Sequence, residues 1–241
     1  MARRRKKNNK LFLSLIGALL LFVMTYYQEE ITIYLAKKTG NYVSYGIDEV
    51  PKYNGKDYVI IDDNVPNFKE NDYKKKELEK YSKLDSLKRA GVAIAIISKN
   101  TMPVEKRGSI GSVKPTGWHT VKYDNVDGKY LYNRCHLIGY QLTGENANPN
   151  NLITCTRQMN TGAMLDFENK VAEYVNKTNN RVLYRATPIY KDNNLLASGV
   201  TIEAESLEDD GEGIKFHVYV YNVQDGIDIN YETGESKKCS N

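Results

Sequence analysis

The sequence predicts an α+β fold, an antiparallel sheet with two helices, preceded by one apolar segment near the amino terminus. Short runs rich in β-branched and aromatic residues are separated by turn residues, two longer stretches have helical spacing, and no internal repeat is visible. With 241 residues, 41% of them hydrophobic and 27% charged, the chain can bury one sizeable core. This composition excludes a chain that is disordered throughout.

Residues 1–10 hold six basic residues and no acid, and residues 11–27 follow without a charge. An apolar segment of this length is just long enough for a helix that crosses a bilayer, and positive charge before it predicts a cytoplasmic amino terminus. A cleaved signal peptide is the alternative, although no small-x-small cleavage site follows. We expect a single-pass anchor in the cell membrane, with secretion after cleavage as the alternative. In both cases the rest of the chain is exported.

The remaining chain divides into a polar, tyrosine-rich tether at residues 28–50 and a folded domain at residues 51–241. The formal net charge of +4 comes from the basic head, so the total is no argument for nucleic-acid binding. The distribution of charge along the chain is more informative. Residues 105–160 hold seven Lys and Arg against four acids, whereas residues 192–236 hold eleven acids and one lysine. A polyanion would be attracted to the first region and repelled by the second.

In the first half of the domain, residues 58–61 have the pattern of a buried strand, and residues 91–97 form the strongest strand pattern in the chain. Between them, residues 72–90 have the spacing of an amphipathic helix. Its apolar stripe consists of Leu78, Tyr81, Leu84 and Leu87. Residues 101–118 are rich in Pro and Gly, and we expect a loop that carries Arg107.

In the second half, residues 122–131 predict a hairpin with its turn at Asp127 and Gly128. Residues 152–154 predict a short strand, and residues 164–178 predict a helix with one apolar face. Three further strands are expected at residues 181–185, 200–205 and 215–221.

The stretch Tyr-Asn-Arg-Cys-His-Leu-Ile-Gly-Tyr at residues 132–140 places an arginine and a histidine two positions apart. Side chains alternate between the faces of a strand, so Arg134 and His136 would project from the same face. The pair suits phosphodiester chemistry, because an imidazole can take a proton from water near neutral pH and a guanidinium can bind a phosphate. An asparagine-rich run follows, then Asn160 and Glu168. Together these residues indicate a metal-dependent nuclease site.

Each of these residues alone also has a structural interpretation. A histidine in a strand is more often structural than catalytic, Asn160 could be a helix N-cap, and Glu168 could be a surface residue of a helix. The presence of Arg134 beside it, and the downstream spacing of the other motif residues, favour a catalytic role for His136. For His119 and His217 we keep the structural interpretation.

In order, spacing and residue type, these motifs resemble the DNA/RNA non-specific endonuclease family, which has the ββα-metal (His-Me finger) fold. The family signature Asp-Arg-Gly-His corresponds to residues 133–136, and its Asn-Leu/Ile-x-x-Gln-x-x-x-x-Asn stretch corresponds to residues 151–160, with a glutamate eight positions later. The similarity covers roughly residues 50–235. Asn133 and Cys135 depart from the signature, since they replace its aspartate and glycine, and Cys155 occupies a position often filled by glutamine.

The resemblance implies a metal site and a general base. His136 would take a proton from water, with its ring oriented through the other ring nitrogen. Asn160 would be the single protein ligand of a Mg²⁺ ion, for which Mn²⁺ can substitute, and Glu168 would hold one metal-bound water.

It also implies the residues that bind substrate. Arg134 and Arg107 would bind non-bridging phosphate oxygens, and Asn151 would position the histidine or the metal shell. We therefore expect an anchored, outward-facing, Mg²⁺-dependent endonuclease that cleaves DNA and RNA with little sequence preference and leaves 5′-phosphate ends. No protein partner can be predicted. The alternatives are a catalytically silent surface protein that binds nucleic acid, such as a DNA-uptake receptor, and a structural envelope protein.

Cysteine is sparse, with three residues and no zinc-type spacing. The number excludes a disulfide framework but leaves room for one bridge. Cys135 and Cys155 both lie in the motif region, and their proximity does not follow from the sequence. We expect small buried hydrophobic residues there, with a bridge as the less favoured alternative.

Overall fold

The structure, a computed structural model, describes residues 50 and 52–239. The predicted basic head, the apolar segment and all but the last residue of the tether lie outside this part of the chain. Within it, no helix is long and apolar enough to cross a membrane.

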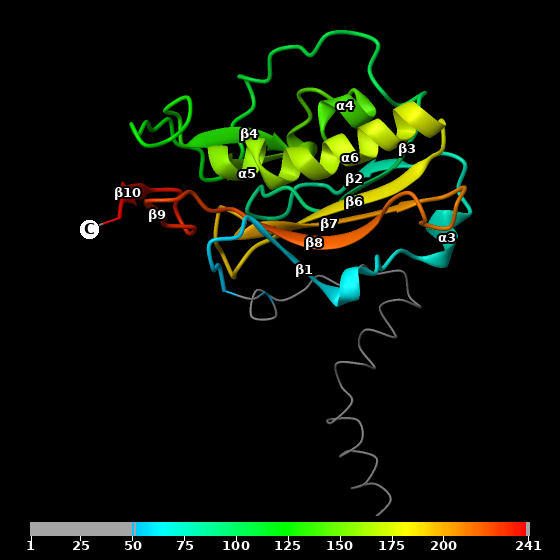
Figure 1. The fold of residues 1–241 in the computed structure, drawn as a ribbon. Helices are drawn as coiled ribbons and strands as arrows, with labels where there is room; N and C mark the ends of the chain where they lie inside the picture. The colour runs from blue at the N-terminus through cyan, green and yellow to red at the C-terminus, as the bar shows by residue number, and fades with distance from the viewer. Residues whose placement is uncertain (1–49, 51, 240–241) are drawn as a thin grey trace, which may run out of the picture. The chain divides into compact units, whose positions relative to one another are not determined.

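A six-stranded antiparallel sheet forms the centre of the fold (Figure 1). In spatial order its strands are β1 (Tyr58–Ile60), β8 (Lys215–Tyr221), β7 (Gly199–Ser206), β6 (Val182–Ile189), β3 (Ala93–Ile97) and β2 (Glu79–Tyr81). The four strands in the middle are almost wholly buried, as their continuous β-branched and aromatic runs predict. The predicted strands at residues 91–97, 181–185, 200–205 and 215–221 are thus confirmed.

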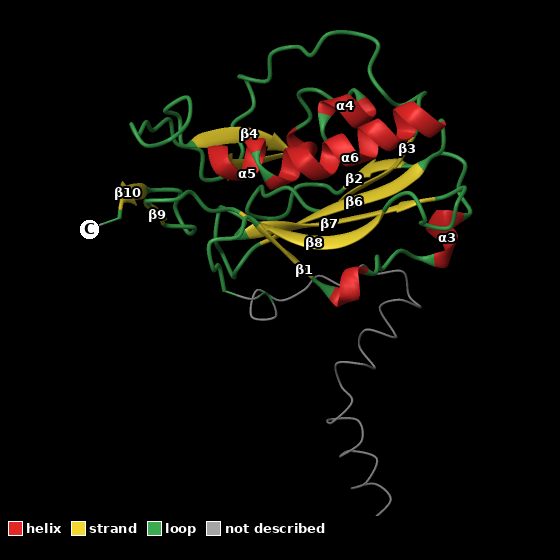
Figure 2. Ribbon diagram, in the orientation of Figure 1, coloured by secondary structure: helices red, strands yellow, loops and turns green. Residues whose placement is uncertain are grey.

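The helix α6 (Ala163–Thr178) lies across one face of this sheet (Figure 2), which confirms the helix predicted at residues 164–178. Its apolar face buries Phe167, Val171 and Val175 in one cluster with side chains of the sheet, and the Phe167 ring lies 4.7 Å from that of Phe216. Burying each large apolar side chain stabilises the fold by about 1.5–3 kcal/mol. The layer therefore holds α6 firmly in place.

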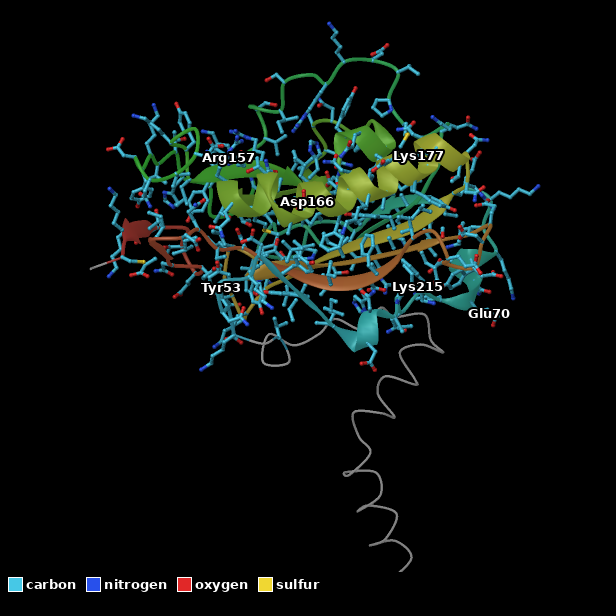
Figure 3. All side chains as sticks on the ribbon, in the orientation of Figure 1. Tyr53, Glu70, Arg157, Asp166, Lys177 and Lys215 are labelled. Carbon is cyan, nitrogen blue, oxygen red and sulfur yellow. A yellow bond between two sulfur atoms is a disulfide. The ribbon has the colours of Figure 1, made fainter. Side chains whose placement is uncertain are left out.

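A second, two-stranded sheet lies in the same layer as the helices (Figure 1). It pairs β4 (Tyr132–His136) with β5 (Leu152–Thr156) in antiparallel register. The short helices beside it are α4 (Tyr140–Thr143), η3 (Pro149–Asn151) and α5 (Arg157–Thr161). In Figure 3, Arg157 marks the start of α5 and Lys177 the last turn of α6, the two ends of the helical layer.

The remaining elements are small. They are η2 (Asp62–Asn64), α3 (Glu70–Tyr73), β9 (Ile227–Ile229) and β10 (Ser236–Lys238). The predicted hairpin at residues 122–131 is present as a single bridge between Lys122 and Tyr130, with Gly128 in its turn at φ 65°.

The helix predicted at residues 72–90 is wrong. That stretch contains the end of α3 and then β2, which pairs with β3 and fills the sheet edge, and the Leu78 carbonyl accepts from the Ile96 amide. Downstream, the Asp85 carboxylate accepts from the backbone amides of Leu87 and Arg89, and Lys88 is left-handed at φ 67°. An aspartate that binds its own backbone favours a turn over a helix.

The strand predicted at residues 58–61 is present as β1, but it is not buried. It pairs with β8 alone and forms the outer edge of the sheet. Tyr58 and Ile60 are 42% and 56% exposed. An uncharged run can therefore form an edge strand as well as a central strand of a sheet. Hydrophobic periodicity does not distinguish the two positions.

Cys135 and Cys155 form a disulfide, contrary to the expectation of two free buried side chains. The register of the strands places them diagonally, because Cys135 faces Ile153 and Asn133 faces Cys155. Their Cα atoms lie 5.9 Å apart, a normal separation for a bridge. The bridge ties the strand that carries His136 to its neighbour.

We expect the double substitution Cys135→Ala and Cys155→Ala to lower the free energy of unfolding by about 3 kcal/mol, because the bridge closes a loop across 20 residues and restricts the unfolded chain. Urea denaturation of the full chain measures this. Cys239→Ser is the matched control, since Cys239 is free and exposed. Equal midpoints for the double variant and the control would show that the bridge contributes nothing.

Candidate active site

His136 is the last residue of β4, and its ring is held from both sides. Nε2 lies 2.7 Å from the backbone oxygen of Asn146, and Nδ1 lies 3.3 Å from Nη2 of Arg107. A carbonyl only accepts and a guanidinium only donates. Nε2 must therefore carry the proton and donate it to Asn146, while Nδ1 is an acceptor. Both contacts assign the same neutral tautomer, with Nδ1 free of a proton.

The surroundings of His136 also keep it neutral. Burial lowers the pKa of His136, the hydrogen bond to the Asn146 carbonyl raises it, and the charge of Arg107 lowers it again. The net result is a pKa below the 6.5 of an ordinary histidine. A neutral imidazole with an unprotonated nitrogen can accept a proton from water.

Asn160 lies in α5, and its side-chain amide is oriented by β4. Its Nδ2 donates a long hydrogen bond of 3.5 Å to Oδ1 of Asn133. The carbonyl oxygen of Asn160 is then the atom that remains for a ligand. Asn160 is not a helix N-cap, because the cap of α5 is the Thr156 side chain, which accepts from the Met159 amide.

Glu168 projects from α6 and is only 8% exposed. Burial raises the pKa of its carboxyl to about 8, although hydrogen bonds from the Gln141 side chain and the Gly139 amide and the nearby charge of Arg107 act in the opposite direction. Burial thus favours the neutral carboxyl, and a cation placed beside it would favour the carboxylate instead.

A cavity of about 310 Å³ brings four of the predicted residues together: Arg107, His136, Asn160 and Glu168. They come from the loop after β3, from β4, from α5 and from α6. The rest of the lining consists of Gly139, Tyr140, Gln141, Thr161, Met164 and Leu165. Two larger hollows of about 670 Å³ lie beside the β9–β10 hairpin and beside β2, and neither contains any of these four residues.

Arg134 does not line the cavity. Its guanidinium donates to the carbonyls of Gly111, at 3.0 Å, and Val113, and it lies over the Trp118 ring at 3.9 Å. The side chain thus anchors the loop that carries Arg107. Arg134 can bind phosphate only through the N–H groups of its guanidinium that these contacts leave unused.

Asn151 does not line the cavity either. It is fully buried, and its side chain accepts from the Ile138 amide at 2.9 Å and donates to the Ile138 carbonyl at 3.0 Å. These bonds fix the turn that follows His136, so Asn151 acts on the site through the backbone.

Sequence reasoning missed several residues. Gly139 and Gln141 line the cavity, and nothing in their sequence pattern indicated it. Asn146 belongs to the asparagine-rich run that was predicted to be part of the site, but the contact of its backbone oxygen with His136 was not predicted. Asn133 offered a signal, because it occupies the first position of the motif. His119 and His217 lie elsewhere, near the Thr233 carbonyl and beside Glu203 respectively, as expected.

The cavity suits a hard divalent cation. The atoms on offer are one amide oxygen, from Asn160, and one carboxylate, from Glu168. In the part of the chain that the structure describes, no group of three or more His, Cys, Asp and Glu could hold a metal. Few protein ligands and several waters are typical of Mg²⁺ sites that also bind phosphate.

Comparison with known proteins agrees with this chemistry. A family model described as DNA/RNA non-specific endonuclease matches residues 66–208, more than half of the chain. The chain belongs to the DNA/RNA non-specific endonuclease family. This endonuclease is therefore a hydrolase, and its α+β fold is that of a nuclease.

Solved structures similar to this endonuclease include NucA from Streptococcus agalactiae with magnesium ion bound, with a TM-score of 0.70 and 25% identity over 80% of this chain and 94% of that one. The Sda1 nuclease with bound zinc ion has a TM-score of 0.57 and 28% identity, over 67% of this chain and 82% of that one. A deoxyribonuclease from Streptococcus dysgalactiae subsp. equisimilis is 36% identical over 110 residues, 44% of this chain. The match covers only 32% of that relative.

We expect His136 to titrate below 6.5 and its pKa to rise in Arg107→Met, because the substitution removes the positive charge beside Nδ1. NMR titration of the imidazole C–H signals measures this, with His136→Gln to assign the resonance. Lys106→Met is the control, since it removes the neighbouring exposed charge on the same loop. A His136 pKa at or above 6.5 in the unsubstituted protein would contradict the assignment.

Proposed function

We propose that this chain is an exported, membrane-anchored, Mg²⁺-dependent endonuclease that hydrolyses DNA and RNA and leaves 5′-phosphate ends. The observation that carries the proposal is the histidine of fixed tautomer beside Arg107, in one cavity with Asn160 and Glu168. Binding nucleic acid would require none of this arrangement.

His136 starts the reaction. A water molecule replaces Arg107 at Nδ1 and gives its proton to this nitrogen, while Nε2 keeps its hydrogen bond to Asn146, so the ring does not have to rotate. The resulting hydroxide attacks phosphorus, and the 3′-oxygen leaves with the electron pair of its bond to phosphorus and takes a proton from solvent water. The Asn146 carbonyl also stabilises the imidazolium that forms, because it accepts a stronger hydrogen bond from a charged donor.

Arg107 binds the reacting phosphate. When the guanidinium leaves Nδ1 to the attacking water, its N–H donors can bind non-bridging oxygens and neutralise charge that develops in the transition state. The phosphate would also lie close to the histidine that activates water. Arg134 supports this geometry by holding the loop and adds positive charge nearby.

Asn160 would hold the metal through its carbonyl oxygen, and Glu168 would hold a metal-bound water. A bound Mg²⁺ supplies charge neutralisation at the phosphate and at the leaving oxygen, and Mn²⁺ can substitute for it. NucA with magnesium and Sda1 with zinc support a divalent ion in this family.

Little sequence preference follows from the nature of these contacts. Phosphate contacts position a nucleic acid without reading its bases. The groups assigned to substrate are guanidinium and metal, and the local excess of positive charge within residues 105–160 attracts any polyanion. The family description, which names both DNA and RNA, supports cleavage of both.

We expect His136→Ala in the full chain to slow plasmid cleavage by about 10²–10⁴-fold, the usual contribution of a general base, with little loss of DNA binding. Cleavage with Mg²⁺, with EDTA and with a structured RNA as second substrate is read on gels, and binding is read by gel shift in EDTA. His119→Ala, which changes a histidine outside the cavity, should cleave normally. A folded wild-type protein that shifts DNA but never cleaves it would support the silent binding protein instead.

The anchor is the second part of the proposal, and residues 11–27 support it through their length, lack of charge and basic flank. We expect the full chain in the membrane fraction, resistant to carbonate extraction, and expect removal of residues 1–27 to abolish that association. Protein found in the medium with an amino terminus beyond residue 27 would establish the secreted alternative.

A further inference from the structure

Residues 103–109, which we call the Arg107 segment, are held in place by side chains. In the part of the chain that the structure describes, no backbone–backbone hydrogen bond involves any of these residues. Residues 104–109 are all exposed, and Val104 is fully so. Neither secondary structure nor apolar burial therefore fixes this part of the long loop between β3 and β4 (Figure 1). Its position depends on side-chain contacts.

Two such contacts come from the chain after β4, and they bracket Arg107. The Tyr140 hydroxyl donates to the Glu105 carbonyl at 2.9 Å, two positions before the arginine. The Asn146 side-chain amide donates to the Ser109 carbonyl, two positions after it, through a longer bond of 3.5 Å. Hydrogen bonds weaken with distance, so the bond from Tyr140 is the stronger of the two.

The contact between Arg107 and His136 cannot hold the segment during the reaction. In the proposed mechanism the guanidinium leaves Nδ1 of His136, from which Nη2 lies 3.3 Å in the structure, and binds phosphate oxygens. A side chain can move in this way only between positions that its own backbone places within reach. The backbone of the segment therefore needs an anchor that does not depend on where the guanidinium is bound.

Tyr140 can supply this anchor because it belongs to a firmly packed element. It is the first residue of α4, lines the cavity, and is followed two positions later by the fully buried Leu142. A tyrosine hydroxyl has one proton to donate, and the Glu105 carbonyl accepts it. While it holds the segment, the hydroxyl thus has no proton left to donate to a phosphate.

We propose that Tyr140 is a positioning residue of this nuclease, which holds the backbone of the Arg107 segment beside the cavity through the Glu105 carbonyl. The inference rests on the proposed function, because it takes Arg107 as the group that binds the reacting phosphate. The Tyr140 hydroxyl acts through the loop and not through a contact of its own with substrate.

The test uses full-length Tyr140→Phe, which keeps the ring and loses only the hydroxyl. We expect kcat/KM for plasmid cleavage to fall about tenfold, because misplacing a substrate-binding group can slow a reaction by up to about a hundredfold. We also expect the pKa of His136, read by NMR in EDTA without substrate, to rise toward its value in Arg107→Met. Tyr81→Phe is the matched control and should keep both wild-type values. Its hydroxyl contacts Thr143 of α4 at 3.2 Å rather than the loop.

The double variant with Tyr140→Phe and Arg107→Met shows whether the effect passes through the arginine. Once Arg107 is absent, loss of the Tyr140 hydroxyl should change neither kcat/KM nor the pKa of His136 any further. An additional change of the same size in the double variant would overturn the proposal, and so would wild-type values in Tyr140→Phe. Wild-type protein that cleaves neither DNA nor RNA would overturn the proposed function instead. The His136 titration needs neither metal nor substrate, so it would still test the role of Tyr140.

Discussion

The pairing of β4 with β5 is the constraint on which the site depends. It fixes His136 opposite Leu152 and brings the intervening chain back so that Asn146 meets the imidazole. Asn151, the last residue of η3 and directly before β5, binds the backbone just beyond His136. A slip of one residue would turn every side chain of β4 to the other face. The disulfide and the buried asparagine both oppose such a slip.

Burial shifts the pKa values of two site residues in opposite directions. Desolvation lowers the pKa of His136 and raises that of Glu168, so it favours the neutral form of both groups. For the histidine this is the form that accepts a proton. For the glutamate it creates a carboxyl that gains from any cation placed nearby, and Arg107 supplies part of that charge. One cavity can thus contain both a base and a carboxyl that a cation would stabilise in its charged form, without a cluster of acidic ligands.

The sequence was sufficient for five of the six strands of the central sheet, for α6 and for four residues that meet in one cavity, because each of these depends on local periodicity or on motif spacing. It failed at residues 72–90, where the apolar side chains have helical spacing but the pairing of β2 with β3 and the turn at Asp85 decide the structure. It also failed where the answer depends on packing between distant elements. The partner of Cys135 follows from strand register, and the hydrogen bond of Gln141 to Asn169 follows from α4 lying against α6.

The Cys135–Cys155 bridge has a consequence for timing. Disulfides form outside the reducing cytosol. If the chain is exported as proposed, the strand that carries His136 acquires its covalent link only after it has left the compartment that contains the cell's own chromosome. Maturation of the enzyme and its separation from the host genome would then be a single event. If β4 depends on this disulfide for its active geometry, the protein would need no separate inhibitor during synthesis.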